Sequence, residues 1–371
     1  MTPSDAAEAL DDALCSLPPF RLRAERRVLH FRRPARTSRG ALVERPILII
    51  RAEGDGRVGE GECSFMPGLS PEAARLTDAP IAAALRQVEA RQALLPAELS
   101  ESPALRFGIE GALLGLRSRS RALWNTTFTQ GRDAIAIHHL VWMDSTERMH
   151  QALRQGAESG ASCLKLKVGA LPLGEELALL RDVKAEFPSV EIRVDANGAF
   201  SPNEAPAILE ALAEAGVSCI EQPLAPGQPR ALAELCRCAP LPIALDEELI
   251  AATSPDARES LLDRLRPQAL VIKPSLHGGL RGAANWASLA EERGMRWWIN
   301  SALESHIGHG ILTQWCGLCA PHTLHGLGTG RLFSDDSLRD IILLGHDLHW
   351  KKSVLRDIKQ APPPSTDPSP R

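Results

Sequence analysis

The stretch Cys163-Leu164-Lys165-Leu166-Lys167-Val168-Gly169 decides the fold, because it places two lysines two residues apart in a run that otherwise has the composition of a buried strand. Successive side chains of a strand point to opposite faces, so Lys165 and Lys167 project to the same side. Two ammonium groups that share an interior face repel each other and lose hydration, which lowers the pKa of each. An exposed edge strand with a solvated face fits the same spacing, so the rest of the chain has to separate the two interpretations.

From about residue 133 onward, strand-like runs alternate with helix-like runs at a spacing of about 26 residues. A right-handed repeat of strand, turn, helix and turn has this length and builds a parallel sheet. Ser201-Pro202-Asn203-Glu204 has capping-box spacing with proline at the first helical position, and Gly216 follows as a stop signal. The expected strands are 134–142, 162–168, 190–194, 217–220, 242–245, 269–272 and 295–299. Seven strands, or eight, favour a closed α/β barrel over an open doubly wound sheet, and no glycine-rich phosphate motif follows any of them.

The residues before this repeat follow a different order. Strand-like runs at 20–23, 46–50 and 59–63 precede helical segments at 71–90 and 104–123, which is the order of an α+β unit. Residues 1–15 fit a short helix or a frayed end. The segment 361–371 carries five prolines, so we expect a disordered tail there.

Composition restricts the class of partner. A formal net charge of -4 gives no general attraction to nucleic acid or to an anionic membrane, and no run approaches the roughly 18 apolar residues of a membrane span. We therefore expect a small-molecule partner; the sequence leaves the oligomeric state open. The eight cysteines are scattered along the chain, and its first residues show no basic stretch followed by an apolar stretch. Both features are typical of a cytoplasmic protein. Two close pairs, Cys236/Cys238 and Cys316/Cys319, lack a matching histidine pattern, which favours packed thiols over zinc.

Charged residues stand at the carboxyl ends of five successive expected strands. In a parallel barrel these ends converge on one mouth, where such barrels carry out their chemistry. A random surface charge has no reason to recur at this position, so the series favours a site over a solvated strand face. In chain order the residues are Lys165 and Lys167, Asp195, Glu221, Asp246 and Lys273.

The three acids predict a metal ion. Carboxylates that converge in one cavity raise each other's pKa unless a cation neutralises them. Oxygen ligands select a hard ion, and Mg²⁺ fits three carboxylates best, with Mn²⁺ as the usual substitute. A metal that neutralises a substrate carboxylate, beside a basic amine, is an arrangement for abstracting an α-proton and stabilising the resulting enediolate. We expect the base to be a lysine.

These residues resemble the enolase superfamily, in particular its muconate-lactonising-like group. Within this group the chain is similar to the o-succinylbenzoate synthases. The similarity rests on the acid and lysine series and on three further stretches: 37–40 (Thr-Ser-Arg-Gly), 299–305 (Ile-Asn-Ser-Ala-Leu-Glu-Ser) and 326–330 (Gly-Leu-Gly-Thr-Gly). The resemblance implies a (β/α)7β modified TIM barrel at 131–325, and an α+β capping domain at 1–130 that is completed by about 326–360.

The resemblance also implies an activity and residue roles. The reaction is the Mg²⁺-dependent dehydration of a succinyl-hydroxycyclohexadiene carboxylate to o-succinylbenzoate, a step of menaquinone biosynthesis. Lys167 takes the α-proton and returns it to the departing hydroxyl, Lys273 stabilises the enediolate as a cation, and Lys165 orients Lys167 and lowers its pKa. The other implied roles are metal binding by Asp195, Glu221 and Asp246, support of these ligands by Asn197 and Glu247, and substrate binding by Ser38, Arg39, Ser301 and Glu304.

Other functions remain open on the sequence. An N-succinylamino acid racemase or a dipeptide epimerase needs the same metal and two opposed lysines. A metal-free Schiff-base aldolase would use Lys167 or Lys273, and a non-catalytic binding protein would leave the acid and lysine series without a purpose. The pair His138-His139 in the first expected strand departs from the smaller polar residues expected in this family, and we assign it no role. Asn197 fits a turn cap equally well.

Overall fold

The computed structural model describes the chain in nine ranges, and everything below concerns these residues: 1–15, 17–37, 40–66, 68–70, 72–73, 77–118, 120–334, 336 and 339–351. Ser38 and Arg39, two of the predicted substrate-binding residues, lie outside them. The predicted disordered tail at 361–371 also lies outside them.

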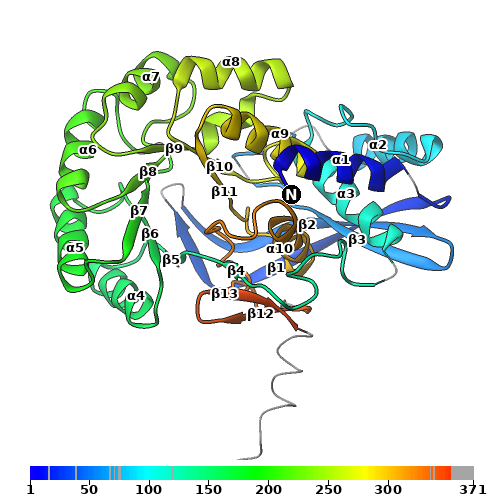
Figure 1. The fold of residues 1–371 in the computed structure, drawn as a ribbon, viewed down its shortest axis with the longest axis horizontal. Helices are drawn as coiled ribbons and strands as arrows, with labels where there is room; N and C mark the ends of the chain where they lie inside the picture. Colours follow the sequence, from blue (N-terminus) through cyan, green and yellow to red (C-terminus); the bar gives the residue numbers. More distant parts are fainter. Residues whose placement is uncertain are drawn as a thin grey trace, which may run out of the picture.

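The N-terminal part is a three-stranded antiparallel sheet with helices against it (Figure 1). The sheet order is β1 (Arg21–Thr37), β2 (Gly40–Gly54) and β3 (Arg57–Cys63). Helix α3 (Pro103–Arg117) lies directly on β3, and glycine makes this approach possible: a Cβ on Gly61 would lie 1.9 Å from the carbonyl oxygen of Gly108. The predicted α+β order is therefore confirmed.

The other N-terminal helices are α1 (Pro3–Cys15) and α2 (Asp78–Arg91). Helix α1 buries Ala6, Leu10 and Leu14, which share one face at helical spacing, so this segment is a packed helix. The expected helix at 71–90 begins later, at Asp78. Pro80 explains part of the difference, because a proline is tolerated in the first turn of a helix and breaks a helix interior.

The predicted alternation of strands and helices after residue 133 is confirmed. Seven parallel strands form one sheet in sequence order, and the helices lie around its outside (Figure 1). The strands are β5 (His139–Val141), β6 (Cys163–Lys167), β7 (Glu191–Asp195), β8 (Cys219–Glu221), β9 (Ile243–Leu245), β10 (Ala269–Ile272) and β11 (Arg296–Ile299). The helices are α4 (Thr146–Glu158), α5 (Leu173–Glu186), α6 (Ala205–Glu214), α7 (Pro229–Cys238), η1 (Glu247–Ala251), α8 (Pro255–Leu265), α9 (Gly279–Glu292) and α10 (His306–Cys319).

His325 and Gly326 connect the residues just before β5 to the last strand of the sheet, β11. The His325 amide donates to the carbonyl oxygen of Ala136 at 2.9 Å, and the Gly326 amide donates to the carbonyl oxygen of Ile299 at 2.8 Å. Parallel bridges of Ile137 with His325 and of Asn300 with Gly326 complete the connection. We call this connection the seam of the barrel.

The first expected strand, 134–142, is divided in two. Its first half is β4 (Ile135–Ala136), which pairs with β13 (Asp347–Trp350), and β13 pairs in turn with β12 (Ile341–Leu344). The C-terminal segment also returns to β1, where the rings of Phe31 and Phe333 lie 4.7 Å apart. The domain boundaries given above stay predictions.

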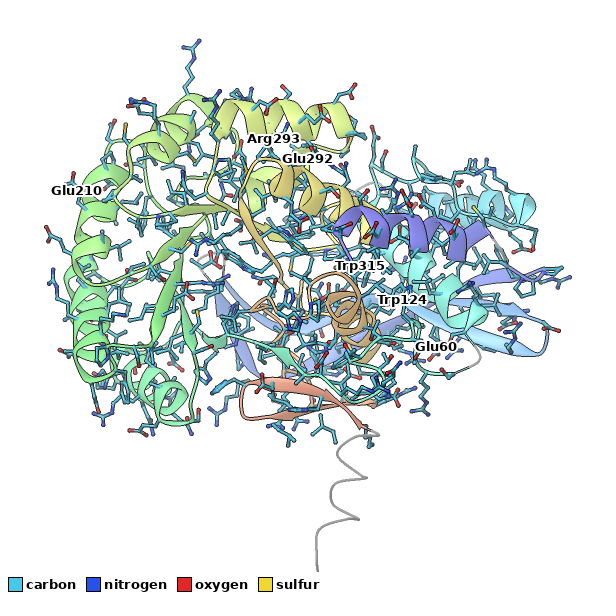
Figure 2. The ribbon with its side chains drawn as sticks, viewed as in Figure 1. Glu60, Trp124, Glu210, Glu292, Arg293 and Trp315 are labelled. Atoms are coloured by element: carbon cyan, nitrogen blue, oxygen red, sulfur yellow. The ribbon has the colours of Figure 1, made fainter. Side chains whose placement is uncertain are left out.

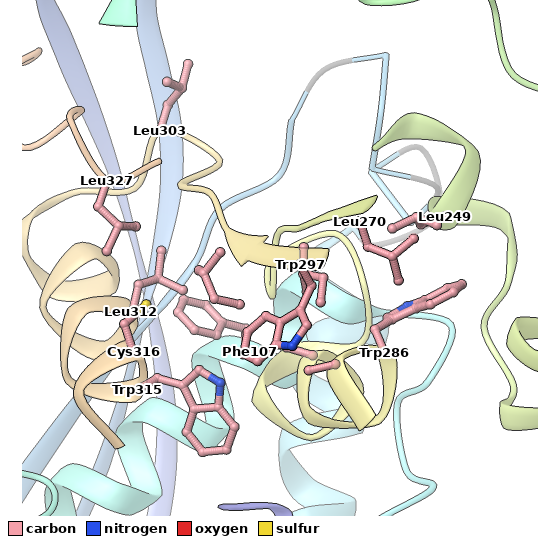
Figure 3. Packing of buried hydrophobic residues seen from close by; sticks show 14 of the residues in the cluster. Phe107, Leu249, Leu270, Trp286, Trp297, Leu303, Leu312, Trp315, Cys316 and Leu327 are labelled. Atoms are coloured by element: carbon pink, nitrogen blue, oxygen red, sulfur yellow. The ribbon is translucent and has the colours of Figure 1, made fainter. Parts of the chain in front are cut away.

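Packing makes the cap and the barrel one continuous core. Figure 3 shows Phe107 of α3, Trp286 of α9 and Trp315 of α10 within the same cluster. The charged side chain of Glu210 on α6 points outward (Figure 2). Trp124 packs against Trp315 with ring centroids 5.6 Å apart. A second, smaller cluster consists of Cys219, Ala244, Ala269, Val271 and Trp298.

All eight cysteines are free thiols, and Cys316 and Cys319 are buried in the core. Among the described residues, no helix combines the length and apolarity needed to cross a lipid bilayer.

Candidate active site

The barrel brings the predicted acids and lysines together. Asp195 and Glu221 end β7 and β8, Asp246 follows β9, and Lys273 follows β10. Lys165 and Lys167 lie on β6, which pairs with β7 so that Lys167 is opposite Asp195. The side chains of the six residues point to one mouth because each stands at the carboxyl end of a parallel strand.

Each lysine contacts a carboxylate. Lys165 Nζ lies 2.5 Å from Glu221 Oε2 and 3.2 Å from Asp195 Oδ2. Lys167 Nζ lies 3.1 Å from the same Asp195 oxygen. Lys273 Nζ forms an ion pair with Asp246 Oδ2 on the other side of the mouth. The two sets of ammonium groups therefore approach the acids from opposite sides.

Burial and neighbouring charges shift the pKa of these groups in opposite directions. Burial, and then the negative charge of Asp195, raises the pKa of Glu221 to about 8. For Asp195 burial acts in the same direction, but the ammonium groups around it outweigh burial and hold its pKa well below the usual range. Glu221 is the carboxylate between the other two, because β8 lies between β7 and β9.

The predicted lowering of lysine pKa values is wrong for Lys165. Burial does lower its pKa, but the charges of Asp195 and Glu221 raise it by more, so the net shift is upward. The pKa of Lys273 is raised for the same reason, mainly by Asp246. For Lys165, repulsion from Lys273 is a smaller effect than the attraction of Asp195 and Glu221.

The donor set fits a hard divalent cation. Glu221 Oε1 and Asp246 Oδ1 are buried and have no hydrogen-bond partner among the described residues. Three carboxylates on adjacent strands supply the oxygen ligands that Mg²⁺ and Mn²⁺ prefer. In the described part of the chain no three acidic, histidine or cysteine side chains are gathered tightly enough to hold a metal ion. Ammonium groups lie on the acids instead. A bound cation would take the place of these ammonium contacts.

Asn197 links several of these groups. Its Oδ1 accepts a hydrogen bond from Lys167 Nζ, its Nδ2 donates to Glu247 Oε1 at 3.0 Å, and its backbone amide donates to Asp195 Oδ1 at 3.0 Å. The backbone of Asn197 is left-handed, with φ of 46°, a conformation that asparagine tolerates better than most residues. The two residues predicted to support the site, Asn197 and Glu247, thus contact each other.

Two further residues near the acids were missed in the sequence. Gln222 Oε1 accepts hydrogen bonds from the amides of Asp246 and Glu248, which ties the end of β8 to the end of β9. His277 Nδ1 accepts from the Lys273 amide at 2.9 Å, and its Nε2 lies 4.0 Å from Asp246 Oδ1. Burial lowers the pKa of His277 to about 3. Both residues lie within five positions of the carboxyl end of a strand. A search of the sequence for polar residues at these positions would have identified them.

Ser301 and Glu304 lie beside the mouth, in the loop after β11. Ser301 Oγ donates to Glu304 Oε2 at 2.6 Å, and Ser275 Oγ donates to Glu304 Oε1 at 2.6 Å. Glu304 is 1% exposed, whereas Ser301 lines the cavity described next. Glu304 therefore connects the loop after β11 to the loop that carries Lys273.

A cavity of about 270 Å³ opens above the acids and lysines. Lys165, Lys167 and Lys273 line its charged side. The cap contributes an apolar side formed by Ala41, Leu42, Met66 and Leu69. The seam contributes polar residues, His138, Asn300, Ser301 and Thr329. The cavity thus combines a charged floor with an apolar cover and an uncharged polar wall.

Comparisons with known proteins point to one family. Residues 147–340 match the family model "Enolase C-terminal domain-like". The chain is 40% identical over 344 residues to the o-succinylbenzoate synthase of Desulfotalea psychrophila, covering 83% of this chain and 93% of that protein. The crystal structure of MenC from D. psychrophila LSv54 superposes with a TM-score of 0.74 at 34% identity, covering 89% of this chain and 99% of that chain.

A more distant structure shares the fold. The dipeptide epimerase of Enterococcus faecalis V583, solved in complex with Mg and the dipeptide L-Leu-L-Tyr, superposes with a TM-score of 0.73 at 17% identity, covering 90% of this chain and 97% of that chain. The family model covers more than half of the chain, and the identity to the D. psychrophila enzyme extends over nearly all of that enzyme's length. The chain therefore belongs to the enolase superfamily, in its muconate-lactonising-like group.

Proposed function

We propose that this enzyme dehydrates 2-succinyl-6-hydroxy-2,4-cyclohexadiene-1-carboxylate to o-succinylbenzoate, as an o-succinylbenzoate synthase of menaquinone biosynthesis in the cytoplasm. The observation that carries the proposal is the placement of Lys167 and Lys273 on opposite sides of three buried acids. The 40% identity to the D. psychrophila enzyme supports the choice of substrate. Enzymes of this superfamily act on small molecules and depend on a divalent metal ion.

Lys167 acts as the base in this proposal. It removes the proton from the carbon that bears the ring carboxylate, and the electron pair moves into the carboxylate to form an enediolate. The pair then returns to form the ring double bond as the carbon-oxygen bond to the hydroxyl breaks. Lys167 gives its proton to the leaving hydroxyl on the same face, so water departs and the lysine is neutral again.

Lys273 and Lys165 have electrostatic roles. The raised pKa of Lys273 keeps it a cation, which suits it to stabilise the enediolate from the face opposite Lys167. Lys165 is 4% exposed and contacts both Asp195 and Glu221, so it is held beside Lys167 in a fixed position. Its role in this proposal is to orient Lys167.

Asp195, Glu221 and Asp246 would hold Mg²⁺, which Mn²⁺ can replace. When bound, the cation neutralises the substrate carboxylate and the charge that develops on it. Asn197 and Glu247 support these ligands through the hydrogen bonds described above. We assign substrate binding to Ser38, Arg39 and Ser301, with Glu304 acting on the substrate through Ser301.

The same geometry also supports a racemase or epimerase of N-succinylated amino acids or dipeptides. Two lysines on opposite faces of one carbon are what a reaction needs if a proton leaves one face and returns to the other. Incubation of an N-succinyl amino acid in deuterated water tests this second function. Rapid racemisation with deuterium incorporation would show that the enzyme is not restricted to dehydration.

A direct assay tests the main proposal. The purified enzyme with Mg²⁺ and the cyclohexadiene substrate should produce o-succinylbenzoate, followed by the absorbance change as the ring becomes aromatic. Exhaustive chelation should abolish the reaction and added Mg²⁺ should restore it. Absence of turnover by the wild type would overturn the proposal. Activity that survives chelation, with a borohydride-trapped adduct on a lysine, would instead support the Schiff-base aldolase.

A further inference from the structure

The imidazole of His277 lies between two residues of the candidate active site. Its Nδ1 accepts a hydrogen bond from the backbone amide of Lys273 at 2.9 Å, and its Nε2 lies 4.0 Å from Asp246 Oδ1. His277 is 2% exposed and does not line the cavity, so it can act on a substrate only through its neighbours. One buried side chain thus connects the loop that carries a lysine of the site with the loop that carries one of its acids.

The contact with Lys273 determines which nitrogen of this imidazole carries the proton. A nitrogen that accepts a hydrogen bond from an amide has no proton of its own, so the ring of His277 is neutral. The one proton of a neutral imidazole then lies on the other nitrogen, Nε2. The pKa of His277, which burial lowers to about 3, agrees with the neutral form. Nε2 is therefore a hydrogen-bond donor.

Both atoms of the 4.0 Å pair are without a partner. His277 Nε2 and Asp246 Oδ1 are buried, and neither forms a hydrogen bond among the described residues. Buried polar atoms are rarely left unsatisfied, and here a donor and an acceptor stand beside each other. A movement of about 1 Å brings them within hydrogen-bonding distance. The geometry thus pairs these two atoms with each other.

A bond from His277 to Asp246 is compatible with metal binding. The other carboxylate oxygen of Asp246, Oδ2, forms the ion pair with Lys273 Nζ that a bound cation would replace. A carboxylate oxygen has two lone pairs, so a hydrogen bond to Oδ1 leaves both oxygens able to meet a cation. The same bond fixes the rotation of the carboxylate, and partners of this kind orient metal ligands in many proteins.

The backbone of His277 is itself held in place. The guanidinium group of Arg258 on α8 donates to the carbonyl oxygen of His277 at 3.4 Å and to Asn285 Oδ1 at 2.9 Å. The His277 amide donates to the carbonyl oxygen of Lys273 at 2.9 Å. A Cβ on Gly282 would lie 2.3 Å from the carbonyl oxygen of His277, so only glycine allows this packing. His277 is therefore a fixed support for its two neighbours.

We propose that His277 is a positioning residue for both Asp246 and Lys273. Its Nε2 proton directs the carboxylate through Oδ1, and its Nδ1 fixes the backbone from which the lysine side chain extends. This inference rests on the proposed function, specifically on the metal site formed by Asp195, Glu221 and Asp246. A single neutral imidazole thereby sets a metal ligand and the ammonium group that stabilises the enediolate relative to each other.

Two substitutions of His277 separate its two contacts. Asparagine places an amide oxygen near the position of Nδ1 and keeps the acceptor for the Lys273 amide, but it does not reach Asp246. Glutamine places an amide nitrogen near the position of Nε2 and keeps the donor to Asp246, but it leaves the Lys273 amide without its acceptor. Titration with Mn²⁺, followed by the electron paramagnetic resonance of the free ion, gives the metal Kd of each variant without any turnover.

The two variants should differ in metal affinity. His277→Asn should bind Mn²⁺ about tenfold more weakly than the wild type, because the Asp246 carboxylate loses the donor that orients it. His277→Gln should keep a Kd close to that of the wild type, and it should lower kcat more than it raises KM because Lys273 is displaced. His277→Leu, which removes both contacts, should show both defects.

A matched control comes from another buried histidine. His309 on α10 is 0% exposed, and its Nε2 contacts the carbonyl oxygen of Leu327. His309→Asn disturbs the core to a similar degree and should leave the Mn²⁺ Kd unchanged. Circular dichroism and thermal unfolding confirm that each variant is folded.

The outcomes separate this inference from the proposed function. A wild-type Mn²⁺ Kd in folded His277→Asn would overturn the inference, and so would equal losses in His277→Asn, His277→Gln and His309→Asn. In either case, turnover of the cyclohexadiene substrate by the wild type would leave the proposed function standing. If the variants show the expected order of Mn²⁺ affinities but the wild type does not turn over that substrate, the proposed function is wrong and the role of His277 stands. A wild type that binds no Mn²⁺ would overturn both.

Discussion

The side chain of Asn197 forms hydrogen bonds with both Lys167 and Glu247. Its Oδ1 accepts a hydrogen bond from the Lys167 ammonium group, and its Nδ2 donates one to the Glu247 carboxylate at 3.0 Å. A flexible lysine has many rotamers, and a fixed acceptor selects the one that points into the cavity. Asn197 is therefore a positioning residue for the base.

We expect Asn197→Gly to lower kcat by about 10- to 100-fold with a smaller change in KM, because the base loses its fixed partner. Glycine accepts the left-handed backbone of this position, so the variant isolates the side chain. Steady-state kinetics and thermal unfolding measure the two effects. Asn197→Ala should lose as much activity and in addition about 1 kcal/mol of stability. Wild-type kcat in both variants would contradict the positioning role.

Lys167→Ala should reduce kcat by about 10²- to 10⁴-fold, the usual contribution of a general base. Lys167→Arg should be equally impaired, since a guanidinium does not give up its proton near neutral pH. The matched control is Lys184→Ala on α5, whose Nζ contacts only the carbonyl oxygen of Val190 in the described structure. Lys184→Ala should keep wild-type kcat. Comparable turnover by Lys167→Ala would assign the base to another residue.

Added Mg²⁺ should raise the melting temperature of the wild type, because a ligand that binds only the folded state stabilises it, by about 2.7 kcal/mol at 100 times Kd. Differential scanning calorimetry with and without Mg²⁺ measures the shift. Glu221→Gln and Asp246→Asn should lose most of it. Glu210→Gln, at an exposed position on α6, should keep it. An equal shift in all three variants would place the metal elsewhere.

Glu110→Ala should destabilise the fold by about 3–5 kcal/mol, because it leaves a buried cation unpaired. Glu110 on α3 pairs with Arg106 at 2.8 Å and accepts hydrogen bonds from the amides of Leu280 and Arg281 at the start of α9. Glu110→Gln retains acceptor oxygens and should cost less. Denaturant unfolding gives both values, and a loss below about 1 kcal/mol in Glu110→Ala would show that α3 and α9 do not depend on this contact.

The sequence by itself predicted that the acids and lysines of the candidate site come together. They follow apolar strands at a regular spacing, and in a parallel barrel that local pattern alone implies convergence at one mouth. The α+β character of the cap was also predictable from the sequence, because strand-like runs precede helix-like runs there. The two-residue spacing of Lys165 and Lys167 correctly placed both on the inner face of β6.

Only the tertiary structure decided the remaining features. The seam joins β11 to the residues just before β5, which lie far apart in the chain, through His325 and Gly326, and no local pattern signals that pairing. The wall formed by His138, Asn300 and Thr329 exists only once this closure is made. The net direction of the lysine pKa shifts depended on distances to carboxylates from other strands. A sequence specifies the period of each element, whereas non-local contacts and the charges around a buried group become defined only when the chain has folded.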